Sequence, residues 1–180
     1  MNSLIISPHN DDLELYCCYT AMREKPLVVV VTDSYIQPNR GEIGCSARER
    51  REETSKAMKL AGCPVYFAGI RDDMVDNMDL INLFCNFEGF EKVYAPAIQG
   101  GNPQHDMIGN MAVQVFGDKL VQYTTYTKTE LWTPGSIEVV PTQEEIELKE
   151  KMLWCYQSQI KLPSTAPHFE AVLGKSEWLI

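Results

Sequence analysis

The sequence lacks a long apolar run, a surplus of basic residues and closely paired cysteines. No apolar stretch approaches the roughly 18 to 20 residues of a membrane-spanning helix, and no basic region opens the N-terminus. The 16 Lys and Arg are outnumbered by 25 Asp and Glu, and the net charge of −9 repels the phosphates of nucleic acid. We therefore expect a cytoplasmic protein with no membrane span and no nucleic-acid partner.

The cysteines exclude two further kinds of site. Six cysteines are present, but no two of them form a C-x-x-C pair, which argues against a zinc knuckle and against a thioredoxin-type redox pair. We expect them to be free, small buried hydrophobes in a reducing compartment.

What the sequence does contain is an alternation of short β-branched runs and longer amphipathic segments. This pattern is typical of βαβ units on a parallel sheet, and the near-continuous hydrophobicity of the runs suits a sheet covered on both faces. With no internal repeat or linker in 180 residues, we predict a single α/β domain over residues 1–180, a Rossmann-like three-layer fold with a mostly parallel sheet. The expected strands are Leu4–Ser7, Leu27–Asp33, Val65–Ile70, Lys92–Ile98 and Lys119–Thr127.

Helices are expected between and after these strands. Thr142 and Glu145 form a capping box, so a long helix should begin there, and the segment after Pro163 is expected to be irregular. The connection Ser34–Ala47 is long, and α/β proteins place binding sites in such loops at the carboxyl ends of strands. The other expected helices are Asp12–Arg23, Arg48–Ala61, Met74–Phe87 and Asp106–Phe116.

The turn after the first strand carries a histidine and two aspartates, His9, Asp11 and Asp12. It has no G-x-G-x-x-G motif, and its carboxylates would repel a pyrophosphate, which disfavours dinucleotide binding. An imidazole and a carboxylate are instead suitable ligands for zinc. The alternative is that one aspartate merely caps the following helix.

His105 follows a Gly-Gly loop after the strand Lys92–Ile98. A parallel sheet would bring it close to the first turn, although a histidine at a helix start also serves as a hydrogen-bonded structural residue. Two imidazoles and one carboxylate leave a tetrahedral zinc with one position for water, as in catalytic sites. The remaining aspartate could then act as general base.

These residues resemble the N-acetylglucosaminyl deacetylase family, also called PIG-L or LmbE-like, over nearly the whole chain. Its Pro-His-x-Asp-Asp motif matches residues 8–12, its Arg-x-x-Glu motif matches Arg50 and Glu53, and its last histidine ligand matches His105; Asp72 and the late Y-x-S-Q at 156–159 are weaker marks. The resemblance implies one zinc, or another divalent ion, bound by His9, Asp12 and His105. It further implies that Asp11 is the general base and that Arg50 and Asp72 bind the substrate.

The chain departs from the family pattern at two positions. Asn102 replaces the first histidine of His-x-x-His, and Leu13 replaces the glutamate after the two aspartates, with Glu14 one place later. An asparagine can donate a hydrogen bond to an oxyanion but cannot hand over a proton. The leaving amine would therefore take its proton from Asp11 or from His168, although we expect His168 to be a surface or packing residue.

The expected function is a zinc-dependent hydrolase that removes the acetyl group from an N-acetylated amino sugar or its conjugate. Asp11 acts as base and Asn102 helps to hold the oxyanion. Two alternatives stay open: a non-catalytic metal-binding or sugar-binding domain, and a 2-His-1-carboxylate Fe(II) enzyme, which the βα alternation disfavours. The chain is short for the family, which leaves room for a homo-oligomer.

Overall fold

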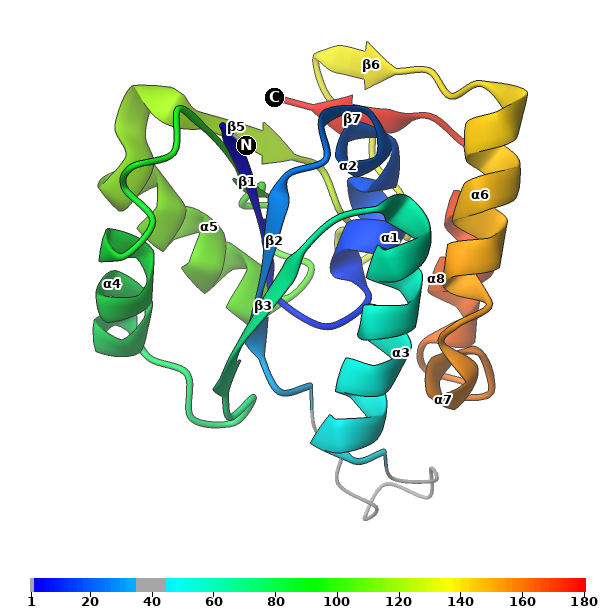
Figure 1. The fold of residues 1–180 in the computed structure, drawn as a ribbon, viewed down its shortest axis with the longest axis horizontal. Helices are drawn as coiled ribbons and strands as arrows, with labels where there is room; N and C mark the ends of the chain where they lie inside the picture. Colours follow the sequence, from blue (N-terminus) through cyan, green and yellow to red (C-terminus); the bar gives the residue numbers. More distant parts are fainter. Residues whose placement is uncertain (1, 35–44) are drawn as a thin grey trace.

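The computed structural model describes residues 2–34 and 45–180, and the strands of these residues form one seven-stranded sheet in the order β3-β2-β1-β4-β5-β7-β6 (Figure 1). The first five strands pair in parallel, and β6 and β7 add an antiparallel edge. The predicted α/β fold with a mostly parallel sheet is therefore confirmed. The strands are β1 Ser3–Ser7, β2 Leu27–Thr32, β3 Val65–Ile70, β4 Lys92–Pro96, β5 Leu120–Tyr123, β6 Ile137–Val139 and β7 Glu177–Leu179.

Helices cover both faces of this sheet. In Figure 1, α4 (Asn77–Cys85) and α5 (Pro103–Phe116) lie on the left of the sheet. Alternate residues of β1 point to opposite faces of the sheet: Ile5 packs into one buried cluster, and Leu4 and Ile6 pack into the other. This two-sided burial explains the continuous hydrophobicity of the strands. On the right are α1 Asp12–Tyr16, α2 Cys18–Glu24, α3 Ala47–Ala61, α6 Gln143–Leu153, α7 Gln157–Ile160 and α8 Ala166–Val172.

Capping residues determine several helix ends. The capping box of α6 is present, since the Thr142 side chain accepts from the Glu145 backbone and the Glu145 side chain accepts from the Thr142 backbone. Gly62 ends α3 in the left-handed conformation at φ 69°. Helix α5 begins at Pro103, three residues before the predicted start at Asp106, because Asn102 caps it.

Several expectations for the elements were wrong. The predicted helix Met74–Phe87 is shorter than expected, because Asp76 caps α4 and the helix runs from Asn77 to Cys85. The predicted helix Asp12–Arg23 is interrupted at Cys17, and the segment after Pro163 is not irregular but forms α8 and β7. One distant residue accounts for the interruption: the Glu177 carboxylate of β7 accepts hydrogen bonds from the backbone N–H groups of Cys18 and Tyr19, at 2.8 and 2.9 Å. It thereby satisfies the first donors of α2. Strand β5 also ends at Tyr123, before the predicted Thr127.

Other expectations concern the surface and the long connection. None of the helices in the described ranges has the length and hydrophobicity that a bilayer span requires. All six cysteines are free, but only four of them are buried as expected, since Cys85 is exposed and Cys155 is half-buried. The long loop predicted at Ser34–Ala47 lies largely outside the described residues, since 35–44 are not among them.

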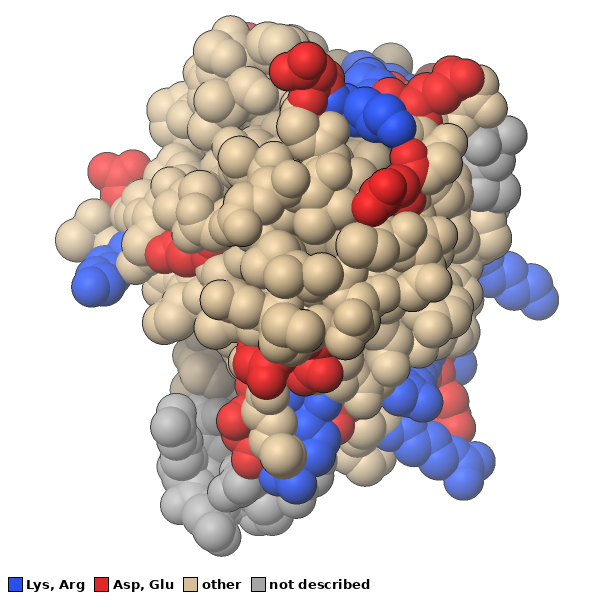
Figure 2. Space-filling view, turned by 90° about the vertical axis from the view of Figure 1, so that its left-hand side faces the viewer, with Lys and Arg blue, Asp and Glu red and all other residues tan. Residues whose placement is uncertain are grey.

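The face that α4 and α5 form has a broad uncharged area with charged side chains around it (Figure 2). Exposed apolar side chains on these two helices include Met78 and Val113. The homo-oligomer that the sequence leaves open stays a prediction, and this face is the first surface on which it would be tested.

Candidate metal centre and active site

The site lies where the strand order reverses. The chain runs from β1 outward to β2 and β3, then returns to the other side of β1 to form β4 and β5. The carboxyl ends of β1 and β4 are therefore a topological switch point, the usual ligand site of an open α/β sheet. His9, Asp11 and Asp12 follow β1, and His105 lies in the first turn of α5 after β4.

Three polar atoms converge at this point. Asp12 Oδ2 lies 2.9 Å from His9 Nδ1 and 3.0 Å from His105 Nε2, and the two imidazole nitrogens are 3.2 Å apart. Each atom can offer a lone pair to a shared cation. Ligand atoms around a tetrahedral zinc are separated by roughly 3.3 Å, given zinc–nitrogen distances near 2.0 Å. The spacing of the three side chains is therefore close to that of a zinc site.

Gln104 determines which ring nitrogen of neutral His9 carries the proton. Gln104 Nε2 donates to the backbone carbonyl of Asp72, and Gln104 Oε1 lies 2.6 Å from His9 Nε2. Because a carbonyl oxygen only accepts, the amide nitrogen of Gln104 has to face Asp72, which leaves its oxygen facing His9. Neutral His9 then carries its proton on Nε2 and presents the lone pair of Nδ1 to Asp12 and His105, the tautomer that a metal requires.

The surrounding carboxylates favour a positive charge at this point. Burial by itself lowers the pKa of His9, but the carboxylates of Asp12 and Asp72 outweigh it and raise that pKa well above its ordinary value. Burial likewise raises the pKa of Asp12, but His105 and His9 outweigh it and hold that pKa well below its ordinary value. His105 Nδ1 is buried without a hydrogen-bond partner among the described residues. This buried imidazole-carboxylate set fits a divalent cation, with zinc the best match to its donors.

Asp11 stands beside the three converging side chains but pairs elsewhere. It occupies the N-cap position of α1, yet its side chain makes no capping hydrogen bond. Its Oδ1 lies 3.0 Å from Nη2 of Arg50, which α3 brings to the site and which is only 2% exposed. Nε and Nη1 of Arg50 have no hydrogen-bond partner within the described ranges. Both residues line a pocket of about 210 Å³ together with His9 and Asp12.

Asp72 and Asn102 also line this pocket. Asp72 Oδ1 lies 3.4 Å from His9 Nε2, on the edge of the ring that faces away from Asp12. Burial raises the pKa of Asp72, but the interaction with His9 outweighs it and lowers that pKa. Asn102 Oδ1 accepts from the backbone N–H of Gln104 at 2.8 Å, and Asn102 Nδ2 donates to the Tyr126 hydroxyl at 3.2 Å. Asn102 is thus both a helix cap and a partner of Tyr126.

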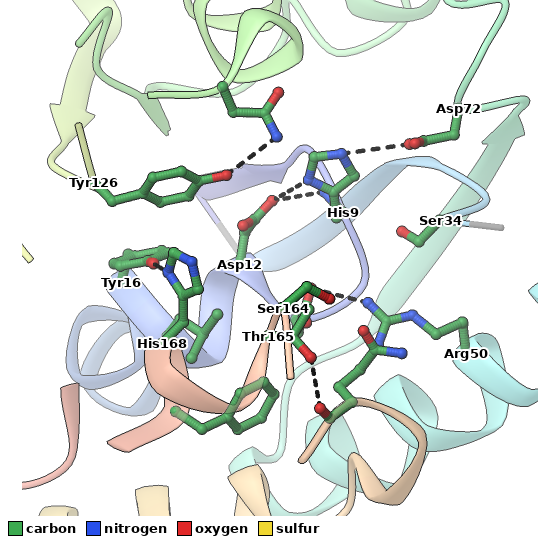
Figure 3. Close-up of a pocket in the computed structure, with 15 residues that line it drawn as sticks. His9, Asp12, Tyr16, Ser34, Arg50, Asp72, Tyr126, Ser164, Thr165 and His168 are labelled. Carbon is green, nitrogen blue, oxygen red and sulfur yellow. Dashed lines mark hydrogen bonds and ion pairs between the residues drawn. The ribbon is translucent and has the colours of Figure 1, made fainter. Parts of the chain in front are cut away.

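Sequence reasoning missed part of the pocket wall. His168 was expected at the surface or in packing, but α8 places it half-buried in the pocket, 2.9 Å from the Tyr16 hydroxyl and with its ring 4.6 Å from that of Tyr126 (Figure 3). Burial lowers the pKa of His168, and burial together with the Asp12 charge raises the pKa of Tyr126 to about 12. The only sequence signal for His168 was the scarcity of histidine, three in the chain.

Of the remaining marks of the resemblance, Gln159 lines the pocket, and the others lie behind the site. Glu53 accepts from the backbone N–H and the hydroxyl of Ser158, at 2.7 and 2.6 Å, and so ties α3 to α7. The Tyr156 hydroxyl lies 2.5 Å from Glu14, whose pKa burial raises to about 8, and 2.7 Å from the Asn10 carbonyl. These residues support the turn that carries His9 and Asp12.

No protein-family model matches the sequence, and no curated protein matches it either. Solved structures do match the fold. A conserved protein of Thermus thermophilus superposes with a TM-score of 0.75 at 19% identity, over 100% of this chain and 94% of that chain. N,N'-diacetylchitobiose deacetylase from Pyrococcus horikoshii superposes with a TM-score of 0.73 at 18% identity, over 99% of this chain and 82% of its own.

The same fold also occurs with a different chemistry. The 4-carboxy-2-hydroxymuconate hydratase GalB of Pseudomonas putida superposes with a TM-score of 0.69 at 15% identity, over 99% of this chain and 95% of that chain. At these identities the likeness establishes the architecture, and the reaction has to be argued from the site. The chain has the fold of this deacetylase and of this hydratase, in agreement with its resemblance to the N-acetylglucosaminyl deacetylase family.

Proposed function

We propose that the chain is a metal-dependent hydrolase that removes the acetyl group from an N-acetylated amino sugar or its conjugate. One observation carries the proposal: His9, Asp12 and His105 converge at the switch point of the sheet, and His9 and Asp12 line the same pocket as the Asp11–Arg50 pair. The motif resemblance and the fold shared with a diacetylchitobiose deacetylase support the same reaction. Because a hydratase shares this fold as well, the fold alone does not determine the reaction.

His9 Nδ1, Asp12 and His105 Nε2 would hold one divalent ion, for which zinc is our choice because two imidazoles and a carboxylate are characteristic ligands of catalytic zinc. When bound, such an ion lowers the pKa of water and polarises a carbonyl group. Gln104 keeps His9 in the tautomer that such binding needs. The remaining residues of the pocket are then free to bind the substrate and to move protons.

Asp11 acts as the general base. Its carboxylate takes a proton from the attacking water, and Arg50 fixes it in place through Oδ1. The same carboxylate then returns the proton to the leaving nitrogen. His168 is the less suitable acid, because its lowered pKa leaves it neutral at pH 7. The unpartnered nitrogens of Arg50, together with Asp72, are placed to bind hydroxyl groups of the sugar.

Acetate release tests the proposal directly. The protein would be incubated with N-acetylglucosamine, N,N'-diacetylchitobiose and further N-acetylated amino sugars, and acetate and free amine would be measured in equal amounts. We expect release that stops on chelation and returns with added zinc. Sugar binding without release from any amide would favour the non-catalytic alternative. Oxygen consumption by the iron-loaded protein would favour the Fe(II) alternative.

Gln104 gives a prediction that depends on metal binding alone. In Gln104→Leu the nearer acceptor facing His9 Nε2 is lost, and Asp72 Oδ1 at 3.4 Å is left as the weaker partner that fixes the tautomer of His9. We expect the affinity for zinc to fall by about ten- to a hundredfold, measured by competition with a chelating dye. Gln114→Leu, an exposed position on the same helix, is the matched control and should bind zinc as the unmodified protein does. Equal affinity of the two variants would contradict the role of Gln104.

A further inference from the structure

The hydrogen atoms around Asn102 can be placed from the groups that surround its amide. Oδ1 accepts from the backbone N–H of Gln104, which can only donate, so the orientation of the Asn102 side chain is determined. Nδ2 therefore faces the Tyr126 hydroxyl, 3.2 Å away. Because an amide nitrogen only donates, the Tyr126 oxygen is the acceptor in this contact. The hydroxyl proton of Tyr126 must point elsewhere, and no hydrogen bond among the described residues uses it.

Tyr126 is held in the pocket in a defined orientation. Its ring packs edge-on against His105 on one side, at 5.3 Å, and against His168 on the other, at 4.6 Å. Figure 3 shows its hydroxyl end directed toward His9 and Asp12, on the opposite side of the pocket from Arg50. A phenol with an ordinary pKa near 10 keeps its proton at neutral pH. A protonated donor therefore faces the place where an amide would react.

We infer that the Tyr126 hydroxyl donates a hydrogen bond to the oxyanion formed during amide hydrolysis, and that Asn102 is a positioning residue that acts through it. The inference rests on the proposed function. Water adds to the amide carbon, and the electron pair of the C=O bond moves onto the oxygen, where charge develops and the hydrogen bond strengthens. When that pair returns, the C–N bond breaks, and nitrogen takes the proton that Asp11 removed from water. Tyr126 keeps its own proton throughout.

This assignment accounts for the departure from the family pattern at position 102. A histidine there could itself donate a proton from its ring, as the resemblance implies. Asparagine is shorter, and both ends of its amide are already engaged, one with Gln104 and one with Tyr126. The donor to the oxyanion is therefore not residue 102 itself but its hydrogen-bond partner, the Tyr126 phenol that Asn102 orients.

Tyr126→Phe tests the catalytic role, because it removes one oxygen atom and keeps the ring between the two histidines. We expect kcat for acetate release to fall about a hundredfold, the loss typical of one oxyanion donor, while KM changes less than threefold. Zinc affinity and Tm should stay unchanged. Tyr66→Phe, on the exposed surface of β3, is the matched control and should retain full activity.

Asn102 is tested by two substitutions that keep a good helix cap. In Asn102→Asp the carboxylate still caps α5 but would accept the Tyr126 proton and withdraw it from the substrate, so kcat should fall strongly. Asn102→Ser caps the helix without capturing that proton, and a loss below tenfold is expected. In the Tyr126→Phe background the effect of Asn102→Asp should be at least tenfold smaller than in the unmodified protein. Equal effects in both backgrounds would overturn the positioning role.

The outcomes separate this inference from the proposed function. If the unmodified protein releases no acetate from any amide, both are rejected. If it does and Tyr126→Phe turns over within threefold of it, only the role of Tyr126 is rejected. A loss of activity accompanied by loss of bound zinc or by a lower Tm would make Tyr126 a structural residue and would equally overturn the inference.

Discussion

Replacing Asp11 with asparagine is expected to lower kcat for acetate release by about a thousandfold, within the range of 10²–10⁴ for the loss of a general base. Asparagine has the shape of aspartate and can still accept the hydrogen bond from Arg50, 3.0 Å away in the unmodified protein. It cannot take a proton from water at neutral pH. Zinc affinity should change less than twofold, because Asp11 is not among the three converging residues. Steady-state kinetics and a zinc titration check both expectations.

Asp73→Asn is the matched control for this experiment. Asp73 is exposed and pairs with Arg71 at 2.8 Å on the surface, so its loss should leave kcat within twofold. Unchanged turnover of Asp11→Asn would reject the base assignment. Loss of zinc from Asp11→Asn would instead place this carboxylate among the ligands and leave the identity of the base to another residue.

The parts of the fold that the sequence predicts are those that local rules determine. The strands β1 to β4 appear as apolar runs, and the capping box of α6 needs only Thr142 and Glu145. The break at Cys17 could not be predicted in this way. It depends on Glu177, which reaches the N–H groups of α2 from 159 residues away in the chain. The short β7 and α8 likewise owe their stability to contacts with distant elements.

The candidate site likewise contains residues that the sequence predicts and residues that only the tertiary structure reveals. His9, Asp11 and Asp12 share one turn, and their residue types and position are visible in the sequence. Gln104 and Tyr126 are different, because glutamine and tyrosine are common residues whose roles follow only from the groups that they face. His168 reaches the pocket because α8 packs against α1, a tertiary contact that no local pattern indicates.

The shared fold makes these residue-level contacts decisive for the reaction. A deacetylase and a hydratase superpose almost equally well on this chain, so the architecture provides a place for chemistry without selecting it. Our proposal for the reaction rests on the residues at and beside the pocket: three side chains that could share a cation, a paired carboxylate and a tyrosine whose proton is unused. An amide needs each of these, since its hydrolysis requires activated water, a proton carrier and a donor to the oxyanion.

Replacing Lys149 with methionine is expected to lower the free energy of unfolding by roughly 3–5 kcal/mol. Lys149 is 1% exposed; its Nζ lies 2.8 Å from Glu177 Oε1 and donates to the Leu15 carbonyl at 2.9 Å. Since the same carboxylate holds the N-terminus of α2, this ion pair joins α6, α1, α2 and β7. Methionine fills the space but leaves the charge of Glu177 buried and unpaired. Urea denaturation measures the loss.

If the unpaired charge of Glu177 causes the loss of stability, the results for two further variants can be predicted. In Lys149→Met/Glu177→Gln both charges are absent, and the amide oxygen of glutamine can accept from one of the two backbone N–H groups of α2, so part of the lost stability should return. An exposed pair provides the control: Arg48→Met breaks the contact with Glu52 on the surface of α3 and should leave stability unchanged. A double variant as unstable as Lys149→Met would show that packing by the lysine stem, and not its charge, stabilises this region.

The dependence of Lys149→Met on pH has a definite sign. Burial raises the pKa of Glu177 even in the presence of Lys149, which acts to lower it, so removing the lysine raises that pKa further. Between the ordinary carboxyl pKa and this higher value, the folded chain binds more protons than the unfolded chain, and stability falls as pH rises. The deficit of Lys149→Met should therefore be larger at pH 8 than at pH 5, whereas the double variant, which has no carboxyl group at position 177, should show no such trend. A deficit independent of pH would mean that Glu177 is not the group left unpaired.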